Sequence, residues 1–302
     1  MPPKHLLSLA TAAGRHGRTA FARTVVTPAT APLCRRAFAT TIRAREQAGE
    51  KYAEKAEDVS AKYASKTKGM TRFWKTVSME RVGDTFQITL DGRRMKTPDG
   101  HPIAVPAKRR TLALLIAGEW EGQERLLKSY SLPLTSIVVR ALDSFSDKAI
   151  REGVIENLLK YADTDATCYF QDYPDSFVAL QSTHWKPLHT WLEHTYNLHL
   201  NTTTSILSIK QSPETIRTLR NIISEFDDIE LAAFEKAVLF SKSFVVALAL
   251  VKGRVDVDEA ARAARLELLH QIDRWGEVED AHDVDREECT RQLGAVACVG
   301  LP

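Results

Sequence analysis

The sequence predicts an α+β protein, in which a small β-rich N-terminal domain precedes a larger all-helical C-terminal domain. Between Phe73 and Pro106, apolar residues alternate weakly and Asp-Gly pairs interrupt the run, which is typical of short antiparallel strands. After Lys108, apolar residues recur at steps of three and four, which indicates amphipathic helices. A chain of 302 residues that is 44% hydrophobic is long enough for two modest domains.

Residues 1–45 are predicted to be a mitochondrial transit peptide. They hold eight Lys and Arg and no Asp or Glu, and the first acid is Glu46. Arg-rich, acid-free segments with many Ser, Thr and Ala are typical of mitochondrial targeting. Cleavage is expected after Phe38, and the matrix is the expected location. A disordered basic tail that contacts nucleic acid is the alternative, but such tails are usually rich in Lys. Residues 46–302 carry a formal charge of −6.

The segment from 46 to 107 is predicted to contain a linker and the β-rich domain. Residues 46–69 hold equal numbers of Lys and acids and are expected to form a solvated linker. In the β-rich domain, residues 70–107, Asp91-Gly92 and Asp99-Gly100 are hairpin signals, because a type I′ turn needs positive φ at both central residues. Such a small meander needs a helix to cover it. The helix near 108–129, with the apolar stripe Leu112, Leu115, Ile116, Trp120 and Leu127, is expected to pack on it.

The helical domain is predicted to span residues 130–288. Pro133 and Pro213 stand where a first-turn proline is tolerated, so each is expected to open a helix. Asp256 is a good N-cap, and Gly276 is a natural helix stop. Single helices are expected near 150–161, 174–196, 228–252 and 256–275. No structure is predicted for residues 289–302.

Several classes of function lose support from the sequence. The longest apolar stretch, 237–251, contains Lys242 and is shorter than the roughly 20 residues of a membrane span. Four cysteines without a Cys-x-x-Cys pair argue against a disulfide scaffold or a zinc ribbon. The phosphate-loop, dinucleotide, zinc-protease and serine-hydrolase motifs are missing, so no cofactor is expected. Basic and aromatic residues are not clustered, so nucleic-acid binding is not expected.

Two groups of residues are candidates for metal chemistry. Asp163-Thr164-Asp165 has the carboxylates to chelate a cation, but after a helix end it equally ends one element and caps the next, which is the favoured interpretation. A metal-dependent hydrolase that uses Asp163, Asp165 and a histidine such as His184 is the alternative function. His184, His189 and His194 are five residues apart, a turn of about 140° per step, so they do not share a helix face and no metal site is predicted from them.

The most unusual segment follows Trp275-Gly276. Residues 277–288 contain seven acids and one Arg. Such a run is either a solvated helix end or an acidic surface that steers a basic partner, and the residues alone leave both open. An aromatic residue at a sharp break is the kind of anchor that interfaces use.

Several motifs in one order carry a resemblance to a known family. The sequence resembles the mitochondrial ATP synthase assembly chaperones that bind the alpha subunit of the catalytic head. The resemblance covers roughly residues 70–288, and the residues from Cys289 depart from it. The motifs are Arg72-Phe73-Trp74, the run Leu-Asp-Gly-Arg-Arg-Met-Lys-Thr-Pro at 90–98, Glu119-Trp120, Asp163-Thr164-Asp165, and Trp275-Gly276-Glu277-Val278-Glu279 with His282-Asp283.

The resemblance implies a monomeric two-domain matrix protein without enzymatic turnover or a cofactor. It would hold the alpha subunit soluble until the beta subunit displaces it. It implies partner binding by Glu279, with its neighbours Trp275, Gly276, Glu277, His282 and Asp283. Glu119, Trp120, Asp163 and Asp165 would be structural or would contact the partner. For Trp120 the structural interpretation is favoured, because truncation of a core aromatic typically costs about 3–5 kcal/mol.

Overall fold

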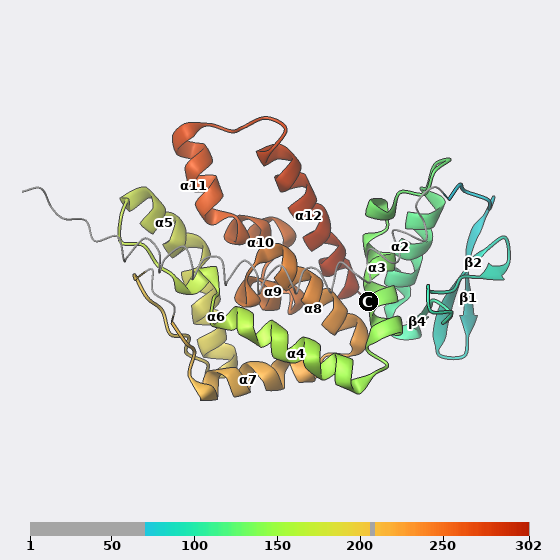
Figure 1. The fold of residues 1–302 in the computed structure, drawn as a ribbon, viewed down its shortest axis with the longest axis horizontal. Coiled ribbons are helices and arrows are strands. Elements are labelled where there is room, and N and C mark those ends of the chain that lie inside the picture. The colour runs from blue at the N-terminus through green and yellow to red at the C-terminus, as the bar shows by residue number, and fades with distance from the viewer. Residues whose placement is uncertain (1–69, 206–208, 302) are drawn as a thin grey trace, which may run out of the picture. The chain divides into compact units, whose positions relative to one another are not determined.

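The computed structural model describes residues 70–205 and 209–301, which belong to one compact unit. The predicted transit peptide, its cleavage site and the linker 46–69 lie outside the described residues. Figure 1 confirms the α+β class, since a small antiparallel sheet precedes a series of helices. Within the two described ranges, none of the helices combines the length and the apolarity that a membrane span requires.

The sheet is built around one central strand. The strand β2 (Thr85–Leu90) pairs antiparallel with β1 (Val77–Val82), β3 (Arg93–Arg94) and β4 (Ala104–Pro106). Its residues Ile88 and Leu90 are buried beneath the first helix. The strand therefore connects every part of the sheet to the hydrophobic core.

The turns of the sheet confirm one prediction and correct another. Asp91 and Gly92 both have positive φ, 48° and 76°, as the predicted type I′ turn requires. At the second Asp-Gly pair only Gly100 has positive φ, and a hydrogen bond from the Thr97 N–H to the His101 carbonyl (2.7 Å) closes a longer turn. Gly83, at φ 60°, reverses the chain between β1 and β2.

The helices follow in chain order. Three short 3₁₀ turns, η1 (Ala107–Arg109), η2 (Ser129–Ser131) and η3 (Ala166–Cys168), lie between elements. Pro133 and Pro213 each stand in the first turn of a helix, as predicted. The helices are α2 (Arg110–Glu121), α3 (Pro133–Ser144), α4 (Lys148–Ala162), α5 (Asp175–His184), α6 (Lys186–Tyr196), α7 (Pro213–Ser224), α8 (Asp228–Ser241), α9 (Phe244–Val251), α10 (Val257–Ala264), α11 (Leu266–Trp275) and α12 (His282–Val299).

The first helix covers the sheet but is shorter than predicted. α2 contacts β1, β2 and β4, and buries Leu112, Ile116 and Trp120. It ends at Glu121, so the expected helix over 108–129 is wrong in its last part. Leu127 is buried as expected, but it lies in an extended segment whose N–H donates to the Met70 carbonyl (3.0 Å).

Three predicted single helices are each two helices, because a local break interrupts a continuing apolar pattern. The range 174–196 breaks at Trp185, just before Pro187, which has no N–H to donate. The range 228–252 breaks at Lys242, which has φ 55°, and the Ser243 hydroxyl then caps α9. The range 256–275 breaks at Arg265, although its predicted start is confirmed: the Asp256 carboxylate accepts from the Glu259 N–H (2.8 Å).

The core of the helical region is formed by α8 and α9, whose side chains are mostly buried against α3, α4, α10 and α12. The predicted boundary after residue 288 falls inside α12. Cys289, Leu293 and Val296 are buried and extend the core, so the residues from 289 to 299 belong to this helix rather than to a tail. The boundary at 130 between a β-rich and a helical domain stays a prediction.

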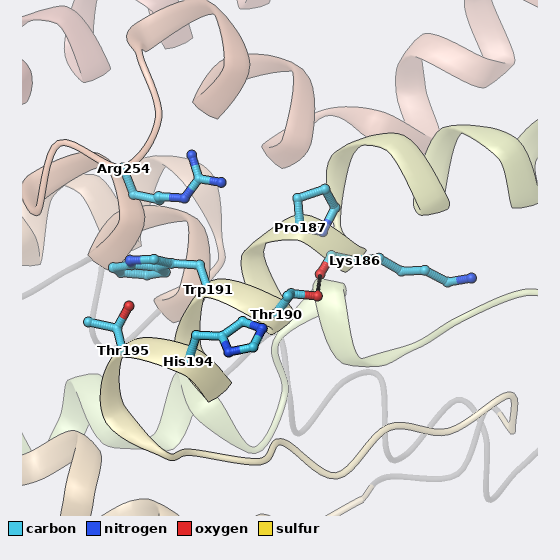
Figure 2. A pocket seen from close by; sticks show the side chains of 7 residues that line it. All are labelled: Lys186, Pro187, Thr190, Trp191, His194, Thr195 and Arg254. Carbon is cyan, nitrogen blue, oxygen red and sulfur yellow. Dashed lines mark hydrogen bonds between the residues drawn. The ribbon is translucent and has the colours of Figure 1, made fainter.

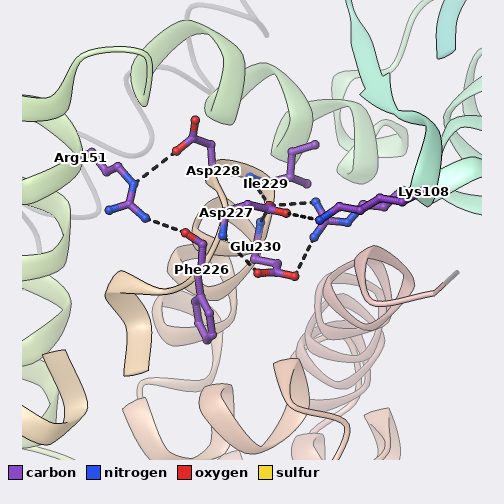
Figure 3. Close-up of polar contacts among 8 residues, drawn as sticks. Lys108, Arg151, Phe226, Asp227, Asp228, Ile229 and Glu230 are labelled. Atoms are coloured by element: carbon purple, nitrogen blue, oxygen red, sulfur yellow. Dashed lines mark hydrogen bonds and ion pairs between the residues drawn. The ribbon is translucent and has the colours of Figure 1, made fainter. Parts of the chain in front are cut away.

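A buried arginine ties the segment after the sheet to the start of α8, where Figure 3 shows its partners Asp227 and Glu230. Arg109, which is buried, donates to Asp227 (2.9 Å) and to Glu230 (2.7 Å) at the start of α8. The Asp227 carboxylate also caps α8 by accepting from the Glu230 N–H (3.0 Å). Burial opposes its ionisation, but the hydrogen bonds from Arg109 and from the helix outweigh burial and lower the pKa of Asp227. Charge and helix capping therefore stabilise the same junction.

Candidate partner-binding surface

The acidic segment lies in the connection between α11 and α12, at the top of Figure 1. Gly276 ends α11 with φ 89°, a conformation that side-chain-bearing residues rarely adopt. The connection is then held by a reciprocal pair of hydrogen bonds: the Val278 N–H donates to His282 Nδ1 (3.0 Å), and the His282 N–H donates to the Val278 carbonyl (3.0 Å). His282 therefore shapes the loop rather than extending from it.

The acids of this segment divide into paired and unpaired groups. Arg286 lies 3.0 Å from Glu277, and Arg291 lies 2.6 Å from Glu288. Asp285 is paired in the same way with Arg265, at 2.8 Å. The unpaired negative charge is thus confined to a part of the run.

The unpaired acids are concentrated near the tip of the loop. Glu279 and Asp280 are exposed, and neither forms a hydrogen bond or an ion pair with any residue in the described ranges. Asp283 is half-buried, and its Oδ1 is buried without a hydrogen-bond partner among the described residues. The carboxylates of Glu279 and Asp280 are therefore available to an external cation or to a basic side chain.

Large apolar side chains are exposed beside these acids. Trp275 is 73% exposed, and the Arg274 guanidinium lies 5.7 Å from the centre of its ring. Val278 and Val284 are more than half exposed. We call Trp275, Val278, Glu279 and Asp280 the acidic loop surface. It combines the two properties that interfaces use, an apolar anchor and an unpaired charge.

Glu119 and Trp120 lie elsewhere, on α2, where they hold the start of α3. The Glu119 carboxylate accepts from the N–H groups of Leu134 (2.6 Å) and Thr135 (2.9 Å), and so supplies the cap that α3 lacks from its own N-cap residue. Burial raises the pKa of Glu119, while these hydrogen bonds oppose the shift. Trp120 is buried and donates from Nε1 to the Thr135 hydroxyl (3.0 Å). The centre of its ring lies 5.2 Å from the centre of the Trp74 ring. These contacts favour the structural interpretation of both residues.

The Asp163-Thr164-Asp165 segment joins parts of the chain that are distant in sequence. Asp163 accepts from the Gln211 N–H (2.8 Å). The fully buried Asp165 accepts from Thr167, from the Ser243 hydroxyl (2.8 Å) and from the Val245 N–H (2.9 Å) at the start of α9. Burial raises the pKa of Asp165, and these donors oppose the shift. Its oxygens are therefore already engaged by hydrogen-bond donors.

The three histidines line three different hollows. His194 lies beside Trp191 and Arg254, in the hollow that Figure 2 shows. His184 lines another hollow with Val255 and Glu259, and His189 a third with Phe170 and Gln181. Within residues 70–205 and 209–301, no cluster of three or more His, Cys, Asp or Glu is arranged to hold a metal ion.

Some features of the acidic loop surface were not singled out from the sequence. The exposure of Val278 and Val284 has only a weak signal, which is an apolar residue inside an acidic run. The unpaired state of Asp280 has none, because it depends on where Arg265, Arg286 and Arg291 point in the fold.

Comparisons with known proteins agree with this architecture. The family model described as ATP12 chaperone protein matches residues 71–193. The chain is 34% identical over 234 residues to "Protein atp12, mitochondrial" of Schizosaccharomyces pombe, covering 75% of this chain and 80% of that protein. It is 30% identical over 272 residues to "Protein ATP12, mitochondrial" of Saccharomyces cerevisiae, covering 76% of this chain and 84% of that protein.

Solved structures show the same similarity. The crystal structure of Atp12 from Paracoccus denitrificans matches with a TM-score of 0.66 and 27% identity, over 76% of this chain and 95% of that chain. The Atu1473 protein of Agrobacterium tumefaciens, described as a candidate chaperone, matches with a TM-score of 0.72 and 25% identity, over 83% and 98%.

Proposed function

Because this chain belongs to the ATP12 chaperone family, we propose that it is an ATP-independent assembly chaperone for the mitochondrial ATP synthase. In this proposal, it binds the unassembled alpha subunit of the catalytic head in the mitochondrial matrix and prevents its aggregation. It acts as a monomer, without a cofactor, and the beta subunit displaces it. The mitochondrial names of the two yeast relatives and the composition of residues 1–45 support the location.

One observation carries the binding part of this proposal: the acidic loop surface places an exposed Trp275 beside the unpaired Glu279 and Asp280. An orphan alpha subunit exposes the apolar surface that would face beta, and large exposed apolar patches aggregate. The apolar side chains of the loop supply affinity, while the carboxylates accelerate encounter and set the orientation. Release then needs no nucleotide, because a partner that binds more tightly wins by competition.

Co-expression tests the proposal directly. Residues 39–302 are produced together with the alpha subunit, and soluble alpha is measured by sedimentation with and without the chaperone. We expect alpha to remain soluble in a complex, and added beta to release the chaperone. Alpha that precipitates equally with and without this chain would contradict the proposal.

Two other functions are alternatives to this proposal. The metal-dependent hydrolase is set aside, because the family consists of chaperones and the carboxylate of Asp165 is engaged by internal donors. The other is a structural subunit that remains in the final complex. Co-purification with assembled ATP synthase, instead of with free alpha, would favour that function.

A further inference from the structure

An apolar hollow of about 440 Å³ lies in the β-rich region, far in sequence from the acidic loop surface. It is bordered by the segment before β1, the β2–β3 hairpin and the end of α2. Its apolar lining includes Met70, Phe73, Met95, Trp120 and Leu127, and its basic rim is formed by Arg93, Arg94 and Lys96. We call this hollow with its rim the basic groove.

Of the apolar residues of the basic groove, Met70 and Phe73 are exposed, whereas Met95, Trp120 and Leu127 form its buried floor. Phe73 is 66% exposed, and its ring packs edge-on against the buried Trp74 at 5.1 Å. Before Phe73 in the chain, the Arg72 guanidinium holds the segment by donating to the carbonyls of Glu121 (2.8 Å) and Gln123 (2.7 Å).

A carboxylate holds the residues that follow Phe73 in the same segment. Asp91 accepts from the N–H groups of Lys75 (3.0 Å) and Thr76 (2.9 Å). These backbone hydrogen bonds, first that of Thr76, lower the pKa of Asp91. An exposed aromatic residue on a clamped backbone is preorganised, so less entropy is lost when a partner covers it.

The rim of the basic groove carries unpaired positive charge. Arg93, Arg94 and Lys96 are exposed, and none of them forms an ion pair or a side-chain hydrogen bond with another described residue. The surrounding sequence is basic as well: residues 70–110 contain nine Lys and Arg and four Asp and Glu, a formal charge of +5. Residues 111–302 contain nineteen Lys and Arg and thirty Asp and Glu, a formal charge of −11. The groove is thus a basic site on an otherwise acidic molecule.

We propose that the basic groove binds a segment of the client polypeptide in which large apolar side chains alternate with Asp or Glu. This inference rests on the chaperone function proposed above. Apolar side chains of such a segment fill the hollow between Phe73 and Trp120, while its carboxylates meet the three cations of the rim. An anionic membrane fits less well, because a flat surface does not enter a hollow whose apolar residues lie between the hairpin and α2.

A peptide-binding experiment on residues 39–302 tests the groove. The probe is a fluorescein-labelled peptide of alternating leucine and glutamate, and its dissociation constant is measured by fluorescence anisotropy at low and at high salt. We expect binding that weakens with salt. Any binding of the leucine–lysine peptide, whose charge suits the acidic loop surface instead, should be unaffected by variants of the groove. The triple variant Arg93→Glu, Arg94→Glu, Lys96→Glu is expected to bind about tenfold more weakly. Phe73→Ser should weaken binding as well, with less change in its salt dependence.

A matched control separates the groove from the overall charge of the molecule. Lys148, Lys210 and Arg217 are also exposed, and changing all three to Glu alters the net charge by the same amount. This control should bind the acidic peptide almost as wild type does, and Arg93→Lys with Arg94→Lys should retain binding. Equal weakening by both triple variants would overturn the proposal. Phosphatidylglycerol vesicles that displace the peptide and lose binding in the groove variant alone would also overturn it, in favour of a lipid surface.

The outcome is independent of the co-expression test. If wild type keeps alpha soluble but does not bind the acidic peptide, the groove proposal fails and the proposed function stands. If wild type binds the peptide through the groove but does not protect alpha, the proposed function fails instead.

Discussion

The acidic loop surface and the basic groove both combine an exposed aromatic residue with unpaired charges, but the charges have opposite signs. Each exposes an aromatic residue, Trp275 or Phe73, next to charges that no described residue neutralises. At the loop, the aromatic ends a helix and the free charges are negative. At the groove, the aromatic is clamped over a buried tryptophan and the free charges are positive.

In the proposed function, the two surfaces would contact a client at two separate places without the protein closing around it. A client surface that pairs with one site is repelled by the other, so the two sites together define an orientation and not only an affinity. The junction at Arg109 ties the chain that follows the sheet to the start of α8.

The largest effects should come from comparing two tryptophans. Trp120→Ala removes a buried side chain that lines the groove and donates to Thr135, so we expect the free energy of unfolding to fall by about 3–5 kcal/mol. Trp275→Ala removes an exposed side chain and should change stability by less than about 0.5 kcal/mol, yet weaken alpha binding. Urea unfolding and co-sedimentation with alpha measure the two effects. Equal losses of stability would contradict the assignment of Trp275 to a binding surface.

Local signals explain what could be predicted from the sequence. The turn at Asp91-Gly92, the first-turn Pro213 and the cap at Asp256 each depend on a few neighbouring residues, and all three were predicted. The break at Lys242 was not, because the carboxylate that engages Ser243 is contributed by Asp165, from a distant part of the chain.

The two surfaces differ in the same respect. The residues of the acidic loop surface are adjacent in the sequence, so their proximity could be predicted although their pairing could not. The basic groove assembles Met70, Arg93 and Trp120 from three separate elements. It follows only from the pairing of the extended segment at Met70 with Leu127 and from the packing of α2 on the sheet.

A smaller effect is expected when the charge of the acidic loop surface is reversed. Glu279→Lys places a positive charge where an unpaired carboxylate stood, so association with alpha should slow by about tenfold at low salt, and by less as salt rises. Surface plasmon resonance on immobilised alpha measures the association rate. The control is Glu287→Lys, which changes the net charge equally at an exposed acid that already faces Arg286 (3.5 Å). If Glu279→Lys bound alpha at the wild-type rate at low salt, the acidic loop surface would not be part of the interface.

The smallest effect concerns Lys236 of α8, where the elements that carry the two surfaces converge. Lys236 donates to the Ser136 hydroxyl of α3 (3.0 Å), and Glu119 of α2 and Glu288 and Arg291 of α12 act on its charge. Burial, followed by the positive charge of Arg291, lowers the pKa of Lys236 from 10.5 to about 8, although the two glutamates oppose the shift.

The pH dependence of stability tests this arrangement. Between pH 8 and 10.5 the unfolded chain binds more protons at Lys236 than the folded chain does. The contribution of Lys236 to the free energy of unfolding therefore rises with pH across that window, and this gain is lost as the pH falls through 8. The rise is expected to stay below about 1.4 kcal/mol per pH unit. Lys236→Met should remove it, and urea unfolding at several pH values measures the difference from wild type, which cancels the titration of other groups. If the free energy of unfolding of Lys236→Met rose with pH as steeply as that of wild type, the lysine would remain solvated in the folded protein. The helices around it would then be packed less closely than the hydrogen bond to Ser136 requires.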